Sequence, residues 1–250
     1  KMRKVKLTDI APYSGTRVQP FEGVKKYMST GDMQNDELSF VEVTYTGKPS
    51  RADILVSEGD VLFAKMVNTD KALQIDKSLD GIIVSTGFSV HRPIEKKLNN
   101  EFFLHFLKHN SFHRQKNRFC TGAIQSAITN TGIEKIYVPL PEYSEQYEIA
   151  KTLNKAEDLI TQRRKSIDLL DEFLRSTFSA LFGNPVTNKY KHDIVKLKEH
   201  IVFLTSGGRG WSEHYSTTGA RFIRSLDAQK NNISEEEKVN VTPPNSQEAE

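Results

Sequence analysis

The chain has 250 residues, of which 37% are hydrophobic and 27% are charged, a balance typical of a globular protein rather than a disordered one. No stretch approaches the roughly 20 apolar residues of a membrane-spanning helix, and no apolar run follows the basic start of the chain, so we expect neither a membrane nor a secreted protein. The single cysteine, Cys120, allows no disulfide within the chain and fits a cytoplasmic protein, while a net charge of +3 is too small to indicate a nucleic-acid partner.

Residues 1–143 predict a domain of mixed strands and short helices, which is an α+β fold. Strands are expected where β-branched and aromatic residues lie between glycines or prolines, at 38–45, 61–64, 81–90 and 136–141. A helix is expected over 101–109, where four apolar side chains recur at helical spacing, namely Phe102, Phe103, Phe106 and Leu107.

Residues 144–183 predict one long helix, because 145–182 contain no proline and no glycine. With Leu153 at heptad position a, every a position is apolar, which defines an apolar seam of Leu153, Ile160, Ile167, Leu174 and Leu181. The d positions are mixed and comprise Ile149, Ala156, Arg163, Leu170 and Thr177. The pattern favours a coiled coil with a partner helix, in which Arg163 reaches a carboxylate or water. The alternative is an amphipathic helix that lies on its own domain.

The sequence after the helix resembles a second copy of the beginning. Gly183 and Pro185 end the helix, and 184–191 read as a linker. Three segments then recur in the same order, with 5–10 at 195–201, 27–33 at 222–228 and 41–43 at 239–241. Glu250 arrives before any counterpart of 59–63, so we expect residues 192–250 to be the incomplete start of a second domain.

Catalytic and cofactor motifs are absent from the sequence. There is no P-loop, no dinucleotide-binding glycine motif, no nucleophile elbow and no zinc-protease helix motif. His105 and His109 have the spacing of a metal pair, but no third ligand lies nearby in sequence, so we expect no metal site. The sequence predicts a protein that is not an enzyme and needs no cofactor.

The distribution of charge points to DNA. Residues 102–133 contain no Asp or Glu, although acids make up 32 of the 250 residues, and a second polar loop follows the strand at 61–64. Lysine and arginine attract phosphates, while small polar side chains hold phosphates or read base edges. The candidate DNA contacts are Lys65, Asn68, Thr69, Lys71, Lys108, Arg114, Lys116, Arg118, Thr121, Gln125 and Ser126. The alternatives are a solvated basic face and an ordinary connecting loop.

Together these features resemble the specificity (S) subunit of type I restriction–modification systems. The resemblance runs nearly end to end through short motifs, namely Gly59-Asp60-Val61-Leu62-Phe63-Ala64-Lys65, Ser85-Thr86-Gly87-Phe88, Arg92-Pro93, Gly122-Ala123-Ile124-Gln125, Ile136-Tyr137-Val138-Pro139-Leu140-Pro141, Glu145-Gln146-Tyr147-Glu148-Ile149 and Leu181-Phe182-Gly183-Asn184-Pro185. It implies a non-catalytic subunit with two target-recognition domains, each of which reads half of a bipartite DNA site in the major groove. It also implies two antiparallel spacer helices that dock methyltransferase subunits and, through them, the restriction subunit.

This chain departs from that pattern because it lacks most of the second domain and the second helix. We therefore expect that two chains pair their helices antiparallel to form a homodimer. Two other interpretations remain open: a helical-arm interaction protein without DNA binding, and an S-like fragment of a fused restriction–methylation enzyme.

Overall fold

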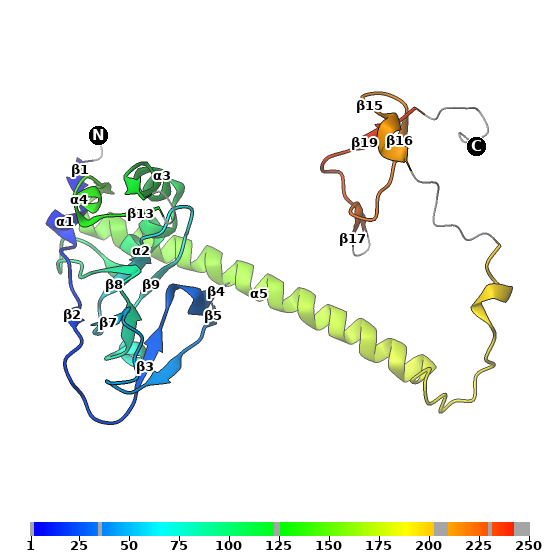
Figure 1. Ribbon diagram of the computed structural model, residues 1–250, viewed down its shortest axis with the longest axis horizontal. Helices are drawn as coiled ribbons and strands as arrows, with labels where there is room; N and C mark the ends of the chain where they lie inside the picture. Colours follow the sequence, from blue (N-terminus) through cyan, green and yellow to red (C-terminus); the bar gives the residue numbers. More distant parts are fainter. Residues whose placement is uncertain (1–2, 35–36, 123–125, 203–209, 230–231, 243–250) are drawn as a thin grey trace. The chain divides into compact units, whose positions relative to one another are not determined.

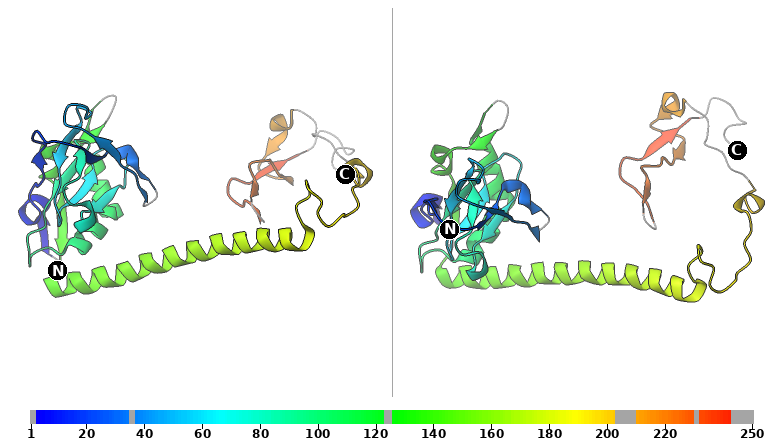
Figure 2. Two further views of the ribbon diagram at one scale, coloured as in Figure 1. Left: turned by 90° about the horizontal axis from the view of Figure 1, so that it is seen from below. Right: turned by 60° about the horizontal axis from the view of Figure 1, so that its bottom comes forward.

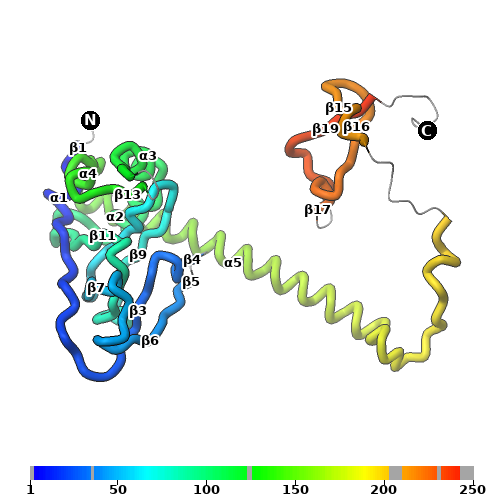
Figure 3. Tube along the Cα trace, in the orientation of Figure 1, coloured from blue at the N-terminus to red at the C-terminus, as the bar shows by residue number. Residues whose placement is uncertain are grey.

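The computed structural model describes residues 3–34, 37–122, 126–202, 210–229 and 232–242. The chain divides into two compact units, Lys1–Ser176 and Thr177–Glu250, which are considered separately (Figure 1). The mixture of strands, short helices and one long helix confirms the predicted α+β class. Figure 3 follows the path of the chain through these elements.

Two sheets form the body of the first unit. The larger sheet has the order β2-β7-β10-β3-β6, in which β10 and β3 are parallel and the other neighbours antiparallel. Its strands are β2 (Thr16–Arg17), β7 (Ala52–Leu55), β10 (Ile83–Ser85), β3 (Lys25–Met28) and β6 (Val41–Val43). The smaller sheet is antiparallel with the order β11-β8-β9, and its strands are β11 (Phe88–His91), β8 (Val61–Ala64) and β9 (Ala72–Gln74).

Short elements complete this unit. The paired strands are β1 (Arg3–Lys6) with β14 (Tyr137–Leu140), β4 (Met33–Gln34) with β5 (Glu37–Leu38), and β12 (Cys120–Thr121) with β13 (Ala127–Ile128). The helical turns are α1 (Leu7–Ile10), η1 (Thr30–Asp32), η2 (Lys77–Leu79) and α4 (Asn130–Ile133). The segment predicted as one strand over 81–90 is divided between the two sheets, because the chain bends at Thr86-Gly87, where the Thr86 amide donates to the Arg51 carbonyl at 2.9 Å.

Strand β8 lies between two hydrophobic cores. Val61 and Phe63 face the core built with α2 (Asn100–Lys108) and α3 (Asn110–Arg118), whereas Leu62 and Ala64 face the core shared with the larger sheet. Successive side chains of a strand point to opposite faces, so a strand buried on both sides is apolar at every position. This explains the uninterrupted Val-Leu-Phe-Ala run and fixes the point where the following loop emerges.

Helix α5 (Tyr143–Phe182) lies against the first domain through its N-terminal half. Gln146 and Ala150 are its buried residues, and the helix then continues well beyond the strands of the domain (Figure 2). Its bounds lie within one residue of the predicted 144–183. None of the helices in the described ranges is long and apolar enough to cross a bilayer.

The second unit repeats strand pairings of the first. Its elements are η3 (Leu197–Glu199), η4 (Trp211–His214), β15 (Tyr215–Ser216), β16 (Ala220–Phe222), β17 (Ala228–Gln229), β18 (Asn232–Ile233) and β19 (Val239–Val241). The β16–β19 register matches that of β3–β6, and the β17–β18 hairpin matches β4–β5. Two of the three repeated segments, 27–33 with 222–228 and 41–43 with 239–241, lie in these pairings, whereas 195–201 contains only η3 where 5–10 contains the end of β1 and α1.

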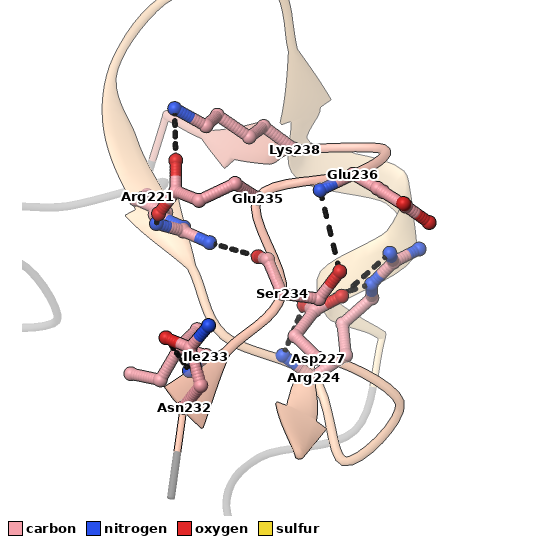
Figure 4. Close-up of polar contacts among 9 residues, drawn as sticks. All are labelled: Arg221, Arg224, Asp227, Asn232, Ile233, Ser234, Glu235, Glu236 and Lys238. Atoms are coloured by element: carbon pink, nitrogen blue, oxygen red, sulfur yellow. Dashed lines mark hydrogen bonds and ion pairs between the residues drawn. The ribbon is translucent and has the colours of Figure 1, made fainter. Parts of the chain in front are cut away.

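One side-chain turn is also repeated. Asp32 Oδ2 accepts the Ser29 amide at 2.7 Å, and Asp227 Oδ2 accepts the Arg224 amide at 2.8 Å. Figure 4 shows Asp227 held by Arg224, whose guanidinium donates to both of its carboxylate oxygens. This pairing lowers the pKa of Asp227 to about 2. The backbone resemblance therefore extends to the carboxylate that closes the turn.

Candidate nucleic-acid interface

Three segments that are distant in sequence meet at one side of the first domain. They are the 65–71 loop between β8 and β9, the last turn of α3, and the β12–β13 hairpin. The Val67 amide donates to the Ser126 carbonyl at 3.0 Å, the Ile128 amide donates to the Lys65 carbonyl at 2.9 Å, and Met66 bridges to Ala127. The two polar regions selected from the sequence therefore form one surface.

The 65–71 loop has a tight conformation that its own residues support. Asn68 has a φ of 56°, in the left-handed region that asparagine tolerates better than most residues. Its amide donates to Asn117 Oδ1 at 3.1 Å, and Asn117 Nδ2 donates back to Asn68 Oδ1 at 2.9 Å. The Thr69 hydroxyl donates to the Met66 carbonyl at 2.7 Å. The side chains of Asn68 and Thr69 thus shape the loop as well as lie on it.

Lys116 is a wrong prediction among the DNA contacts. It is 1% exposed, and its Nζ donates to the carbonyls of Ala64 at 3.2 Å and Met66 at 2.9 Å. It also donates to the Thr69 carbonyl and, at 3.0 Å, to the Thr69 hydroxyl. Burial lowers the pKa of Lys116 to about 8. The ammonium group is enclosed by protein oxygens and cannot meet a phosphate.

The orientation of Lys116 follows from helix α3, which the sequence analysis did not predict. Lys116 lies one turn after Phe112, which is buried against Phe63 and Phe106. Arg114 and Arg118, four residues apart, share the opposite face and are exposed. Within the described residues neither guanidinium group has an ion pair or hydrogen bond. Both guanidinium groups are free cations on this surface.

Lys65 lies in a polar groove beside the loop. Two cavities of about 440 and 330 Å³ share Lys65, Thr86 and Asn130 in their lining, and Arg51 lines the larger one. Burial lowers the pKa of Lys65, and its ammonium group has no hydrogen bond or ion pair within the described part of the chain. The sequence analysis did not select Arg51, Thr86 or Asn130, although Thr86 lies in one of the short motifs.

Lys71 and Lys108 are occupied elsewhere. Lys71 Nζ donates to the Thr30 carbonyl at 2.7 Å, and Lys108 pairs with Glu157 of α5 at 3.4 Å. Both line a cavity of about 710 Å³ along α5, and its lining also includes Asp70, Glu157 and Arg164. Lys108 therefore joins the domain to its helix instead of extending the basic surface.

Three candidates for DNA contact remain, namely Thr121, Gln125 and Ser126, and two of them are described on the β12–β13 hairpin. Thr121 is exposed on β12, and Ser126 is half-buried with its carbonyl used by Val67. Gln125 lies outside the described residues. Of the histidine pair considered for metal, His105 bonds Asn154 at 2.6 Å and lies 3.6 Å from the Glu157 carboxylate, and His109 accepts the Ser111 amide at the start of α3. Among the residues with described positions, no cluster of three or more His, Cys, Asp or Glu could hold a metal.

The apolar seam of α5 is uncovered. Exposure along it rises from 41% at Leu153 to 66% at Leu181, and the d-position residues Ile149, Ala156, Arg163 and Leu170 are also exposed. The helix contacts its own domain through another face, where Asn154 Nδ2 donates to Glu101 at 2.9 Å and Glu157 meets Lys108. The first turns therefore lie on the domain as the alternative reading expected, but the seam does not. Further apolar side chains at the flanking e and g positions widen the exposed face, namely Leu159, Phe173 and Phe178.

Comparisons with known proteins agree with this arrangement. The chain is 26% identical over 213 residues to the type I restriction enzyme MjaVIII specificity subunit of Methanocaldococcus jannaschii, a match covering 76% of this chain and 45% of that protein. Its fold resembles a chain in a structure on complex assembly and conformational transition of the type I R-M system, with TM-score 0.62, 22% identity, and coverage of 91% of this chain and 63% of that one. It also resembles the HsdS subunit from Thermoanaerobacter tengcongensis, with TM-score 0.55, 21% identity, and coverage of 77% and 51%.

The chain thus spans about half the length of these relatives. A family model described as the type I restriction modification DNA specificity domain matches residues 1–169, which include the basic surface and more than half of α5. The chain belongs to the family of type I restriction–modification DNA specificity domains.

Proposed function

We propose that this chain recognises double-stranded DNA as a non-catalytic specificity component of a cytoplasmic type I restriction–modification complex. Its first domain reads one half of a bipartite site. Its long helix docks methyltransferase subunits and, through them, the restriction subunit. The observation that carries DNA binding is the pair of free guanidinium groups, Arg114 and Arg118, beside the polar 65–71 loop. Arginine side chains on one helix face supply the phosphate attraction on which protein–DNA affinity depends.

Charge reversal on this face tests the proposal. Replacing Arg114→Glu together with Arg118→Glu is expected to weaken binding to duplex DNA and to reduce the slope of log affinity against log salt by roughly 2, since each lost phosphate contact contributes about 0.9. Fluorescence anisotropy of a labelled duplex between low and physiological salt measures both quantities. The matched control is Lys77→Glu with Lys97→Glu, which reverses two exposed cations on η2 and just before α2. An unchanged affinity and slope in the arginine variant would place the DNA surface elsewhere.

We also propose that two chains associate through the apolar seam. A stripe of exposed Leu and Ile residues at heptad spacing needs a partner of the same kind, and an antiparallel second copy supplies the helix that the resemblance leads us to expect.

Light scattering coupled to size-exclusion chromatography is expected to give the mass of two chains. Ile167→Glu with Leu174→Glu places charges in the apolar seam and is expected to yield the mass of one chain. Gln162→Glu with Ser176→Glu adds the same charge at exposed c positions and should leave the dimer intact. A single-chain mass for the unaltered protein at high concentration would exclude the homodimer. Dimerisation without any DNA binding would favour the helical-arm interaction protein.

A further inference from the structure

We propose that Lys116 is a positioning residue for DNA recognition, which holds the 65–71 loop in the shape that faces DNA without touching DNA itself. This inference rests on the proposed DNA-binding function. It assigns to a buried cation of α3 a role that its surface neighbours Arg114 and Arg118 do not have.

The first step concerns the inner side of the loop. Three carbonyl groups, those of Ala64, Met66 and Thr69, turn inward and converge on Lys116 Nζ together with the Thr69 hydroxyl. Inward carbonyls at the end of a strand have no ladder partner and would be costly to bury unpaired. The ammonium group offers three donors to these four oxygens, and the Thr69 hydroxyl donates in addition to the Met66 carbonyl, so the two side chains together satisfy the inner surface of the turn.

The second step concerns charge. Burying an ammonium group is unfavourable unless its hydrogen bonds are replaced, and here they are replaced by backbone and hydroxyl oxygens. Within the described residues Lys116 has no ion pair, and the ionisable groups that influence it are Asp70 on the loop and Cys120 and His113 beside it on the chain. A lysine on the surface would keep its hydration, and an apolar residue of this size could pack against Phe112, so neither would carry the desolvation cost of a buried ammonium group. What the cation adds is the fixed geometry of the loop.

The third step connects this geometry to the exposed surface. The residue after Lys116 is Asn117, whose side chain exchanges two hydrogen bonds with Asn68 at the outer side of the loop. The next residue, Arg118, is exposed. Three consecutive residues of α3 thus act on this surface in turn. Lys116 binds the inner carbonyls of the loop, Asn117 binds Asn68 on its outer side, and Arg118 presents a free guanidinium group beside it. The relative position of loop and arginine is set by a single helical turn.

The test compares Lys116→Met with wild-type protein in two measurements on the full chain. Hydrogen exchange of the Val67 and Asn68 amides reports how firmly the loop is held. We expect both amides to exchange roughly tenfold faster or more in the variant, because the loop loses its hydrogen bonds to a charged group. The amides of β11 serve as the internal reference and should keep their rates. Binding to a pool of duplexes with randomised central positions reports the function.

In that pool, wild-type protein is expected to enrich a sequence motif, and Lys116→Met is expected to lose about tenfold of the enrichment while keeping the salt slope. Asn117→Ala releases the same loop from its outer side without altering the buried cation, so it provides the same readouts if Lys116→Met fails to fold. Lys77→Met removes an exposed lysine on η2 and should match wild type in both measurements.

Each of the other possible outcomes contradicts a specific part of the proposal. A salt slope reduced by about 0.9 with unchanged loop exchange would make Lys116 a direct phosphate contact and overturn the inference. Faster loop exchange with full enrichment, in either loop variant, would overturn the role of the loop in reading DNA. If wild-type protein neither binds the pool nor enriches a motif, the proposed function fails, and the loop loses its DNA role whatever the exchange rates show.

Discussion

Replacing Gln146 by leucine is expected to destabilise the first domain by roughly 3 kcal/mol, because it leaves three partly buried backbone groups without partners. Gln146 is 1% exposed, and its Oε1 accepts the Asn99 amide at 2.9 Å. Its Nε2 donates to the carbonyls of Lys97 and Pro141, each at 3.0 Å. One amide side chain therefore ties the start of α5 to the residue that caps α2 and to the strand end before α5.

Urea unfolding at neutral pH measures this loss. Gln162→Leu is the matched control, because it makes the same substitution on an exposed turn of α5 and is expected to change stability by less than about 0.5 kcal/mol. The Gln146 variant should also show weaker coupling between helix and domain, seen as increased proteolysis within 141–150. Equal stability of the two variants would mean that these three hydrogen bonds do not anchor the helix.

Gln146 also shows where sequence periodicity stops being informative. It lies one heptad before Leu153 and would extend the apolar seam as a polar a position, yet the structure buries it in the domain. The helix itself was predictable to within a residue, because a long stretch without glycine or proline and a sustained heptad are local signals. The face by which it meets its domain was not, since that depends on partners such as Asn99, 47 residues away.

For the candidate interface, too, the local signals were predictable from the sequence and the tertiary contacts were not. The acid-free window and the polar loop after β8 were visible in the sequence, and the structure brings them together. Lys116 was misassigned because α3 has few apolar residues, so no helical pattern separated its buried face from that of Arg114 and Arg118. Arg51 and Asn130 join the groove at Lys65 only through the folding of separate strands. Composition located the surface, and only tertiary packing could distinguish the residues that support it from those that face solvent.

The buried histidine of β11 gives the last prediction. His91 is fully buried, and the oxygen of the Ala11 carbonyl can only accept, so Nδ1 carries the proton in their 2.8 Å contact. Nε2 then accepts from the Ser89 hydroxyl at 2.8 Å, while Phe63 stacks on the ring. The neutral tautomer is satisfied on both nitrogens, and a second proton on Nε2 would require the Ser89 hydroxyl to turn and accept. Burial accordingly lowers the pKa of His91 to about 4, although the Ala11 carbonyl and Asp60 partly oppose the shift.

A lowered pKa in the folded state makes stability depend on pH in one direction. Above pH 6.5 His91 is neutral in both the folded and the unfolded chain, and it contributes no pH dependence. As the pH falls from 6.5 towards 4, the unfolded chain binds a proton that the folded chain excludes, so about 1.4 kcal/mol is lost per pH unit and roughly 3 kcal/mol in total. Urea unfolding of wild type and His91→Gln between pH 7 and 4 isolates this contribution, because the acidic groups with lowered pKa, such as Asp53 and Asp76, titrate in both proteins. Wild-type stability should fall more steeply than that of the variant. Parallel curves would show that His91 accepts its proton inside the fold, with the Ser89 hydroxyl turning to accept from Nε2.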